Sequence, residues 1–414
     1  MDDENVLLNV FQYLSFSDSL AVRLISKSFK NICDLRLKID RKSLTLKYQE
    51  SIEKIDFLSK FYLNIHSIDL IDVSLEVADL LSYLKERFPR IRHLGIHRQR
   101  DVNDGNIHLI ADCFPSLKSL TLSTLDVKLN LSPILKALRN LQRLKLDKIY
   151  NIYSQSFSVL KDVQILEIRH VRFTTSQYED MLQVDLAKKL VKLSLVFCVE
   201  ESQKVWKSIG EQMSNLEELE FKTADSLEYI ALNNCKFLRR LTLHAKQCKS
   251  TFPFSTMNSV KQLDLSLFIA SDDDLAMILA SFPSLQNLTF HKYLETRISK
   301  QTCEVVSLLN YLNSFSFVKH DFCLTNSCSE WIQFLEASNS CRNFCIDARC
   351  MTRKECILVL DAFVRMTSRT KYLLNLVFIT IRRLKIKKLE LPKNLKIEFY
   401  HYCQDEDSDD FNEI

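Results

Sequence analysis

Apolar residues recur along the chain in the order LxxLxL, in copies about 22 to 29 residues apart. The clear copies, given by their three apolar positions, are Ile65-Ile68-Leu70, Ile91-Leu94-Ile96, Leu117-Leu120-Leu122, Leu141-Leu144-Leu146, Val163-Leu166-Ile168, Leu190-Leu193-Leu195, Leu216-Leu219-Phe221, Leu238-Leu241-Leu243, Val260-Leu263-Leu265 and Leu285-Leu288-Phe290. Three weaker copies follow at Leu312-Phe315-Phe317, Cys341-Phe344-Ile346 and Leu373-Leu376-Phe378. Because successive side chains of a strand point to opposite faces, the second and third apolar residues of each copy should point inward and their neighbours to solvent.

This repeated pattern is the signature of leucine-rich repeats. It predicts an α/β fold, a leucine-rich-repeat solenoid with parallel β-strands inside and helices outside. Each repeat buries only one edge, so neighbouring repeats must stack to complete a core. One array of this kind absorbs most of the 414 residues, although length alone would suggest two or three domains.

The segments between the predicted strands carry helix signals. Each opens with a capping residue and shows the helical spacing of apolar residues. The predicted helices are Ser74 to Phe88, Asp104 to Phe114, Ser132 to Leu138, Ser202 to Met213, Ser271 to Phe282 and Thr352 to Met366. Three of them end in Phe-Pro, at Phe88-Pro89, Phe114-Pro115 and Phe282-Pro283, where proline ends the helix and launches the next strand.

Two cysteines and one ambiguous segment bear on the register of the repeats. Cys198 and Cys235 each lie three residues after a leucine that can end a copy, a place where leucine-rich repeats carry Asn or Cys to satisfy the turning backbone. Between Phe221 and Leu243 an additional copy at 227–232 also fits the template. We favour a single short repeat of 22 residues there.

The first forty residues differ from the repeats. Glu4 to Leu14 has the apolar spacing of an amphipathic helix, and a second helix capped by Ser17 or Asp18 should follow. Two helices of this size cannot support a core alone, so they need a partner surface or the adjoining array.

The residues Val6-Leu7…Val10-Phe11-Gln12-Tyr13-Leu14…Asp18…Ile25-Ser26-Lys27-Ser28-Phe29…Ile32 resemble the F-box motif. Followed by the repeats, they make the chain similar to the F-box/leucine-rich-repeat family, the substrate receptors of cullin-type SCF ubiquitin ligases. The resemblance implies a Skp-type adaptor and cullin complex as partners, and it implies adaptor binding through Val6, Leu7, Val10, Phe11, Leu14, Leu20, Ile25 and Phe29.

The chain departs from the motif at two places. Asp2-Asp3 stand where the family usually has Leu-Pro, which removes a helix-start preference. Phe29 replaces a common tryptophan, a mild change in apolar burial. The alternative interpretation is a leucine-rich-repeat scaffold without a ubiquitin role, in which these helices only cap the array. A plain cap would more often be polar outside, which favours the F-box.

The formal net charge of +4 combines an acidic C-terminal end with a more basic remainder. The last ten residues contain six acids, Asp405, Glu406, Asp407, Asp409, Asp410 and Glu413, so the remainder carries about +10 (56 basic minus 46 acidic residues). This balance lacks the concentrated basic stripe of a nucleic-acid binder, and we expect no nucleic-acid partner. The expected domains are an F-box at 1–38, an array of about 13 repeats at 39–400 and a disordered acidic tail at 401–414. The period loosens after Cys323, and Arg382 to Lys396 should form terminal strands.

Membrane and secretion signals are weak. The first four residues are acidic where a secretory signal is basic, and the longest apolar stretch, Tyr372 to Ile381, is about half a membrane span. The 13 cysteines form no compact even framework and indicate reduced core residues. We therefore expect a cytoplasmic or nuclear protein with no membrane partner.

Signals for cofactors, metals and catalysis are also weak. Three glycines are too few for phosphate-cradling loops. The cysteines from Cys323 to Cys356 contain no C-x-x-C, and His93 and His97, on one predicted strand, would lie about 13 Å apart, too far for one ion. No nucleophile has an evident base. We expect no cofactor, no metal and no catalytic residue.

The outward positions of the strands form the predicted substrate face, because concave solenoid surfaces present side chains in a regular grid. Its candidate residues are His93, His97, Arg143, Lys145, Arg169, Lys192, Glu218, Glu220, Lys222, Arg240, His244 and His291. Lys192, Glu218 and Arg240 should form a charge ladder across three strands, and Lys145 should pair with Glu167 and Asp147 with Arg169. The sequence thus predicts a non-catalytic receptor, monomeric within its complex, for an unidentified protein substrate.

Overall fold

The computed structural model describes most of residues 43–401; residues 1–42 and 402–414 lie outside the description. The gaps within it are 49–51, 62–63, 153–156, 158, 161, 172–183, 199–208, 224–225, 228–231, 233, 249–255, 270–271, 292–297, 299, 319–327, 348–350, 371 and 381–391. The chain divides into two compact units, Met1–Leu186 and Ala187–Ile414, here called unit 1 and unit 2.

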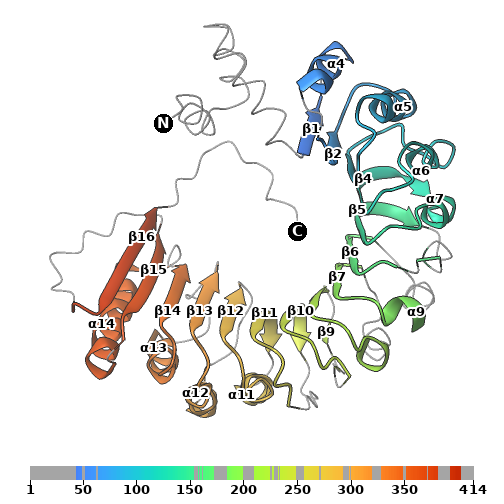
Figure 1. Ribbon diagram of the computed structural model, residues 1–414. Helices are drawn as coiled ribbons and strands as arrows, with labels where there is room; N and C mark the ends of the chain where they lie inside the picture. The colour runs from blue at the N-terminus through green and yellow to red at the C-terminus, as the bar shows by residue number, and fades with distance from the viewer. Residues whose placement is uncertain are drawn as a thin grey trace, which may run out of the picture. The chain divides into compact units, whose positions relative to one another are not determined.

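Unit 1 contains parallel strands that pair in the order of the sequence. They are β1 (Ser43–Lys47), β2 (Ser67–Ile71), β3 (His93–His97), β4 (Ser119–Leu129), β5 (Arg143–Ile152) and β6 (Ile165–Arg169). The connecting helices are α4 (Ile52–Phe61), α5 (Val77–Arg87), α6 (Leu109–Cys113) and α7 (Ser132–Ala137). In Figure 1 helices α5 to α7 lie on one side of these strands, which leaves the other face of the sheet open.

Unit 2 repeats this arrangement of parallel strands and connecting helices. The strands are β7 (Lys192–Val196), β8 (Glu218–Lys222), β10 (Arg240–Cys248), β11 (Gln262–Ile269), β12 (Asn287–His291), β13 (Ser314–Val318), β14 (Asn343–Asp347), β15 (Leu374–Thr380) and β16 (Leu395–His401), with the short β9 (Ser226–Leu227) paired to the end of β10. The helices are α11 (Asp272–Ala280), α12 (Lys300–Ser307), α13 (Cys328–Ala337) and α14 (Arg353–Arg369), while the short α9 (Val184–Ala187) contains the unit boundary. In Figure 1 helices α11 to α14 lie on one side of the unit 2 strands. The leucine-rich-repeat solenoid predicted from the sequence is therefore confirmed.

The apolar template forms the core as predicted. The second and third apolar residues of each copy are buried, for example Leu144 and Leu146 on β5. The first apolar residue of each copy is buried too, except Leu373, which is 50% exposed while the burial on β15 begins at Leu374. The repeat at β15 therefore lacks the apolar first residue that we assigned to it.

Two strands, β1 and β16, were not recognised as copies in the sequence. Arg41 stands at the first template position before β1. Asn394 stands at the corresponding position before β16, where its Nδ2 donates to Thr367 O at 2.9 Å and Thr370 O at 3.1 Å. An amide that bonds helix-end carbonyls thus replaces an apolar residue, and the template does not detect it. Residues 382–391 of the predicted terminal strands lie outside the described residues.

Most of the predicted helices are confirmed. Helices α5, α7, α11 and α14 occupy their expected segments, and α14 begins with a capping box between Thr352 and Glu355. Helix α6 is shorter than predicted, because residues 103–108 form turns in which side chains such as Asn106 bond the backbone. Of the predicted helix at 202–213, residues 202–208 lie outside the described part and 209–212 are helical.

The short repeat of 22 residues is confirmed, since Arg240 on β10 pairs directly with Glu218 on β8. The place assigned to Cys235 is wrong. Cys235 lies before a strand, and its carbonyl accepts from Leu238 N at 3.1 Å, as the carbonyl of Phe88 accepts from Ile91 N at 3.4 Å. It therefore occupies the position of the helix-end phenylalanines, where it is buried.

At the turns after β3 and β7, a side chain forms hydrogen bonds with the bending backbone. Cys198 occupies it after β7, and its thiol donates to Val196 O at 2.9 Å. Gln99 occupies it after β3, where its side chain accepts from Val73 N at 3.1 Å and donates to Val73 O at 2.9 Å. The hydrogen bond of the Cys198 thiol thus supports the expectation that this cysteine satisfies the turning backbone.

A left-handed residue precedes this turn position in successive repeats. The residues with φ between 50° and 55° are Asp72, Arg98, Thr124, Lys148 and His170 in unit 1 and Phe197 in unit 2. The backbone N–H of Asp72 donates to His97 O at 2.9 Å, and that of Arg98 to Ser123 O at 2.9 Å. Each turn therefore bonds the following strand, and side chains other than glycine accept the left-handed conformation there.

Candidate interaction surfaces

The predicted adaptor-binding residues, from Val6 to Phe29, lie outside the described residues. The predicted substrate face lies within them. Its twelve residues all fall on strands, at positions that alternate with the buried template. They lie on the open face of each unit. The structure thus agrees with the direction, away from the core, that the alternating pattern predicts for their side chains.

In unit 1, His97 lies beside a carboxylate that the sequence reasoning missed. His97 Nε2 is 3.6 Å from Asp69 Oδ1 on the neighbouring strand. Gly95 lies between them, and a Cβ there would overlap Asp69 Oδ1 and lie 2.7 Å from His97 Nε2. The strand pattern gave no weight to Gly95, although a glycine inside a strand indicates close approach of a neighbour.

The two charge pairs predicted for β5 and β6 stay predictions. Lys145 and Glu167 share a register position, as do Asp147 and Arg169. Asp147 Oδ1 is buried and accepts no hydrogen bond within the described residues. Register brings the backbones together, but it does not fix the rotamers of long side chains.

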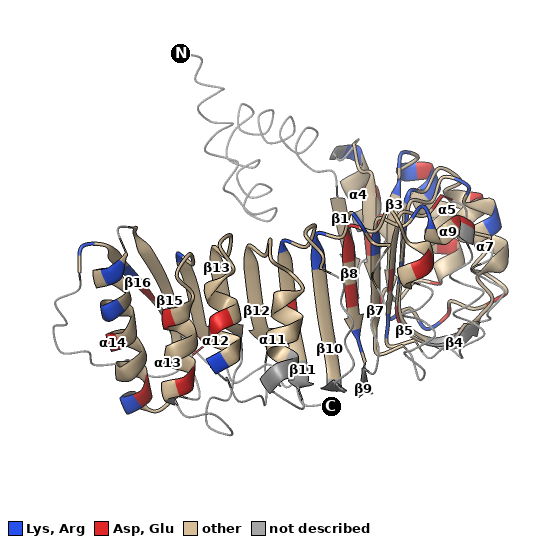
Figure 2. Cartoon of the chain, turned by 90° about the horizontal axis from the view of Figure 1, so that it is seen from below, with Lys and Arg blue, Asp and Glu red and all other residues tan. Residues whose placement is uncertain are grey.

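In unit 2 the predicted ladder is confirmed. Glu218 on β8 lies between two cations, with Lys192 Nζ at 3.7 Å from Oε2 and Arg240 Nη1 at 3.6 Å from Oε1. Figure 2 shows the acidic residues of β8 as red bands on the strand. The cations of this part of the face are thus offset by a carboxylate.

The next row of the same face is also internally bonded. Glu220 accepts from Ser194 Oγ at 2.6 Å and lies 3.0 Å from Lys222 Nζ. Thr242 Oγ1 donates to Asp264 Oδ2 at 3.2 Å. These contacts hold the side chains in place across β7, β8, β10 and β11, which makes the surface pre-organised for a partner.

Two predicted histidines lie on the same face beside these groups. Burial lowers the pKa of His244, and Lys222 and His291 lower it further. Burial also lowers the pKa of His291, against a smaller opposing effect of Asp264. The ring of His244 packs edge-on against Phe197, with centroids 5.7 Å apart. Both imidazoles are therefore neutral at pH 7 and act as polar packing groups.

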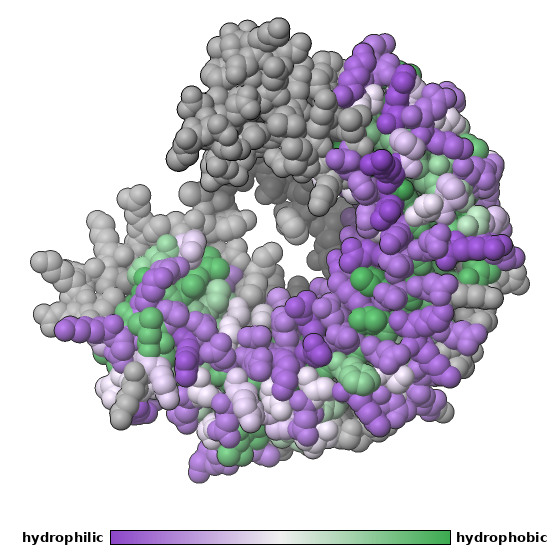
Figure 3. Space-filling view, viewed as in Figure 1, coloured by the Kyte–Doolittle hydropathy of each residue, from purple (hydrophilic) through white to green (hydrophobic). Residues whose placement is uncertain are grey.

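Apolar side chains are exposed at the last strands of unit 2. Phe399 is 38% and Tyr400 56% exposed on β16, and Tyr372 and Leu373 are exposed before β15. Figure 3 shows mainly hydrophilic colour over the described residues of this view, with hydrophobic colour gathered near these strands.

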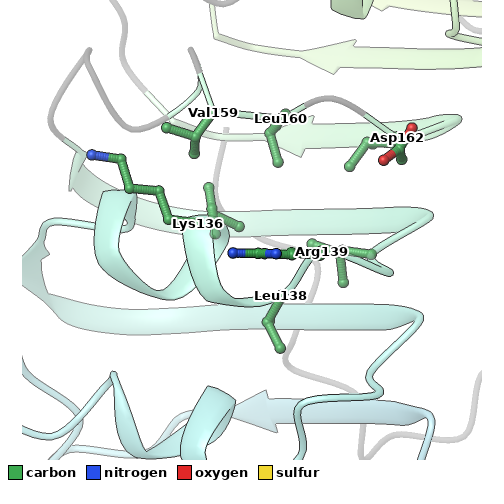
Figure 4. A pocket seen from close by; sticks show the side chains of 9 residues that line it. Lys136, Leu138, Arg139, Val159, Leu160 and Asp162 are labelled. Carbon is green, nitrogen blue, oxygen red and sulfur yellow. The ribbon is translucent and has the colours of Figure 1, made fainter.

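A cavity of about 520 Å³ lies in unit 1. Its apolar lining is Leu135, Leu138, Leu141, Val159, Leu160 and Val163, and its charged lining is Lys136, Arg139 and Asp162. Figure 4 shows Leu138, Leu160 and the three charged side chains around it. The lining is mainly aliphatic and contains no Ser, Cys or His, the residues that most often act as an activated nucleophile or its base.

The cysteines and histidines of the described residues form no metal site. No group of three or more His, Cys, Asp or Glu side chains is placed there to hold an ion. Burial raises the pKa of the Cys341 thiol and of the Cys235 thiol to about 12, so both are protonated packing residues. None of the helices in the described part has the length and apolar content to cross a membrane.

Comparison with known proteins concerns the N-terminal segment, which lies outside the described residues, and the fold of the repeats. Residues 3–39 match the family model described as F-box domain, and this segment contains all eight predicted adaptor-binding residues. No curated protein matches the sequence.

Two solved structures resemble the fold. One is an internalin (inlF) from Listeria monocytogenes, with 13% identity, a TM-score of 0.46 and coverage of 83% of this chain and 94% of that chain. The other is TLR13 in its complex with ssRNA13, with 16% identity, a TM-score of 0.49 and coverage of 76% and 48%, so this chain spans about half the length of TLR13.

Because both TM-scores are below 0.5, the repeat assignment depends on this chain's own strands and register. The chain combines an F-box domain with a leucine-rich-repeat solenoid. This combination confirms the resemblance to the F-box/leucine-rich-repeat family.

Proposed function

We propose that this protein is the substrate-recognition subunit of an SCF-type ubiquitin ligase. The F-box recruits a Skp-type adaptor with its cullin complex, and the repeats hold a protein substrate. The observation that carries the proposal is the F-box match at residues 3–39, directly ahead of a solenoid with an open, pre-organised face. An F-box supports adaptor binding, and the solenoid supports protein binding.

The receptor acts without a reactive side chain of its own. Holding the substrate beside the charged ubiquitin carrier raises the effective concentration of substrate lysines, and this proximity supplies the acceleration. The proposal includes the cytoplasmic or nuclear location expected from the sequence and a single copy of this chain in the complex.

Copurification of the full chain with a Skp-type adaptor tests the proposal. The double variant Val10→Asp with Phe11→Asp places two charges among the apolar residues of the F-box and should abolish copurification. A matched control, Asn9→Asp with Gln12→Asp, adds the same charge at polar positions of the same segment and should retain the adaptor. Retention of the adaptor by the first variant would support the scaffold interpretation, in which the helices only cap the array.

A further inference from the structure

A cluster of cations lies at the edge of unit 1 where its strands begin. Arg92 immediately precedes β3, Lys118 precedes β4, and Arg143 is the first residue of β5. Backbone bonds bring these positions together, since Lys118 N donates to Arg92 O at 2.7 Å and Arg143 N donates to Lys118 O at 3.0 Å. The three cations therefore lie on successive strands at one edge of the sheet, with Arg90 beside them in sequence.

These cations are open to solvent and lack acidic neighbours. Arg90, Arg92 and Arg143 are exposed and Lys118 is half-buried. Within the described residues none of the four forms an ion pair, and the unit 1 pairs lie elsewhere, at Arg87, His97 and His108. In the segments 64–67, 90–93, 116–119, 140–143 and 162–165 the acidic residue is Asp162.

The electrostatics of His93 show that these charges converge. Burial is the main cause that lowers the pKa of His93, and the further causes are Arg143, His66, Lys118 and Arg92. These basic groups from β2 to β5 act on one imidazole and keep it neutral. A positive field of this kind attracts anions and speeds their association.

The opposite edge of unit 1, where the strands end, is mixed in charge. Arg98 and Arg100 follow β3, but Asp72, Asp101 and Asp104 lie on the same edge. The excess of positive charge is therefore restricted to the edge where the strands begin.

We propose that this edge of unit 1 binds an acidic segment of a protein partner, and, on the proposed function, that this segment belongs to the substrate. The strands β3 to β5, where Arg92, Lys118 and Arg143 lie, are two steps of about 4.8 Å apart, so the cluster spans about 10 Å. An extended segment of three or four residues covers this distance at about 3.3 Å per residue. The ligand is therefore a short run of carboxylates.

Two observations favour a protein segment over a nucleic acid. The segments that form the edge contain no Phe, Tyr or Trp, and their rings are the smaller imidazoles of His66 and His93. At the position that Arg92 and Lys118 occupy before β3 and β4, Gln142 and Gln164 stand before β5 and β6, so the cations do not extend along a longer polyanion. The positive charge of this edge therefore matches a short acidic segment better than a long polyanion.

Fluorescence anisotropy with the full chain tests the proposal. The probe is a labelled peptide with about five successive glutamates, and the comparators are the same peptide with glutamines and a single-stranded poly-uridine RNA. The glutamate peptide should bind, with an affinity that falls as salt rises, and the glutamine peptide should not. Arg92→Gln with Arg143→Gln should weaken binding about tenfold.

The matched control removes the same charge at the other end of the same strand. Arg98→Gln with Arg100→Gln should change peptide affinity less than about twofold. Equal weakening by both pairs would overturn the proposal, because only the net charge would matter. Tighter binding of the RNA would also overturn it and assign the edge to nucleic acid.

The acidic residues at the end of the chain compete for the same cations if they reach them, so a version that ends at His401 is titrated beside the full chain. Absence of peptide binding by both versions overturns the proposal. The outcome is separable from that of the proposed function, because Arg92→Gln with Arg143→Gln should keep the adaptor and Val10→Asp with Phe11→Asp should keep the peptide.

Discussion

The two units use one strand template but fill it with side chains of different size. In unit 1 the shared register position passes through Ile68, Leu94, Leu120, Leu144 and Leu166, at intervals of 26, 26, 24 and 22 residues by subtraction. In the later repeats of unit 2 the same position passes through Leu288, Phe315, Phe344 and Leu376, at intervals of 27, 29 and 32 by subtraction. These longer repeats carry helices α12 to α14, of 8, 10 and 17 residues.

A longer connection places a full helix over the strand and leaves more volume to fill. The aromatic residues fill it: Phe315 lies 4.4 Å from Phe317 and 5.1 Å from Phe334 of α13, and Trp331 lies 4.3 Å from Phe317, between ring centroids. Aromatic side chains are therefore the bulk that fills the longer repeats around β13 and α13.

The units differ also in how they treat charge. The ladder of unit 2 sets Glu218 between Lys192 and Arg240, whereas the cations that begin the strands of unit 1 have no carboxylate between them. The charges of the unit 2 ladder are paired with each other, whereas no ion pair among the described residues joins the cations at this edge of unit 1.

Truncation of the unit 2 core should give the largest effect. Phe315→Ala should lower the free energy of unfolding by about 3–5 kcal/mol, because it removes a ring with four aromatic neighbours and leaves a cavity. Denaturant unfolding measures the loss. The control is Tyr311→Ala on an exposed side chain, which should change stability by about 0.5 kcal/mol or less. A small loss for Phe315→Ala would mean that neighbouring rings collapse into the space.

Placing a phenylalanine at a leucine position of unit 1 tests the comparison of side-chain size between the units. Leu144→Phe places an aromatic ring at the fully buried leucine position of a short repeat in unit 1, where overpacking should cost about 1–3 kcal/mol. Thermal or denaturant unfolding checks the sign. A neutral result would show that unit 1 has the same spare volume as unit 2 and would remove the link between repeat length and residue size.

Gly95 offers a test of close approach in unit 1. Gly95→Ala should destabilise by about 1–2 kcal/mol because the new Cβ meets Asp69 Oδ1. Asp69→Ala in the same chain removes that atom and should restore most of the stability. If the cost of Gly95→Ala is the same with and without Asp69, another contact is its cause.

The template predicted the inward residues well, because burial of every second side chain is a property of the strand itself. It failed where a polar residue replaces the first apolar one, as at Asn394, and it assigned Cys235 to a turn after a strand, whereas Cys235 lies before β10. Of the cations of unit 1, Arg143 was a predicted residue of the substrate face, but Arg90, Arg92 and Lys118 were missed because only the outward residues of the strands were considered. Arg92 and Lys118 precede the strands, and only the pairing of the strands brings them together.

The histidines give a pH test in which unit 2 is compared with unit 1. Burial lowers the folded-state pKa of His244 and His291, so on acidification the unfolded chain binds protons first, below about pH 6.5, and stability falls as pH falls. His244→Gln with His291→Gln should flatten this fall between pH 7 and the folded-state pKa values. His93→Gln in unit 1 should act in the same direction. Unfolding measured at several pH values checks the slope, and an unchanged slope would place the acid sensitivity in other groups.

The smallest change in stability should come from a variant of the charge ladder in unit 2. The same variant tests the difference between these paired charges and the cation cluster of unit 1. Glu218→Gln removes the carboxylate between Lys192 and Arg240, and the free energy of unfolding should change by about 1 kcal/mol or less because these pairs are half exposed. Binding of the glutamate peptide should nevertheless increase, since the variant removes the negative charge that lies between Lys192 and Arg240. The control Glu217→Gln changes the same charge one residue away from the ladder. If Glu218→Gln and Glu217→Gln raise peptide binding equally, net charge explains the difference between the units; if only Glu218→Gln does, the pairing of individual charges explains it.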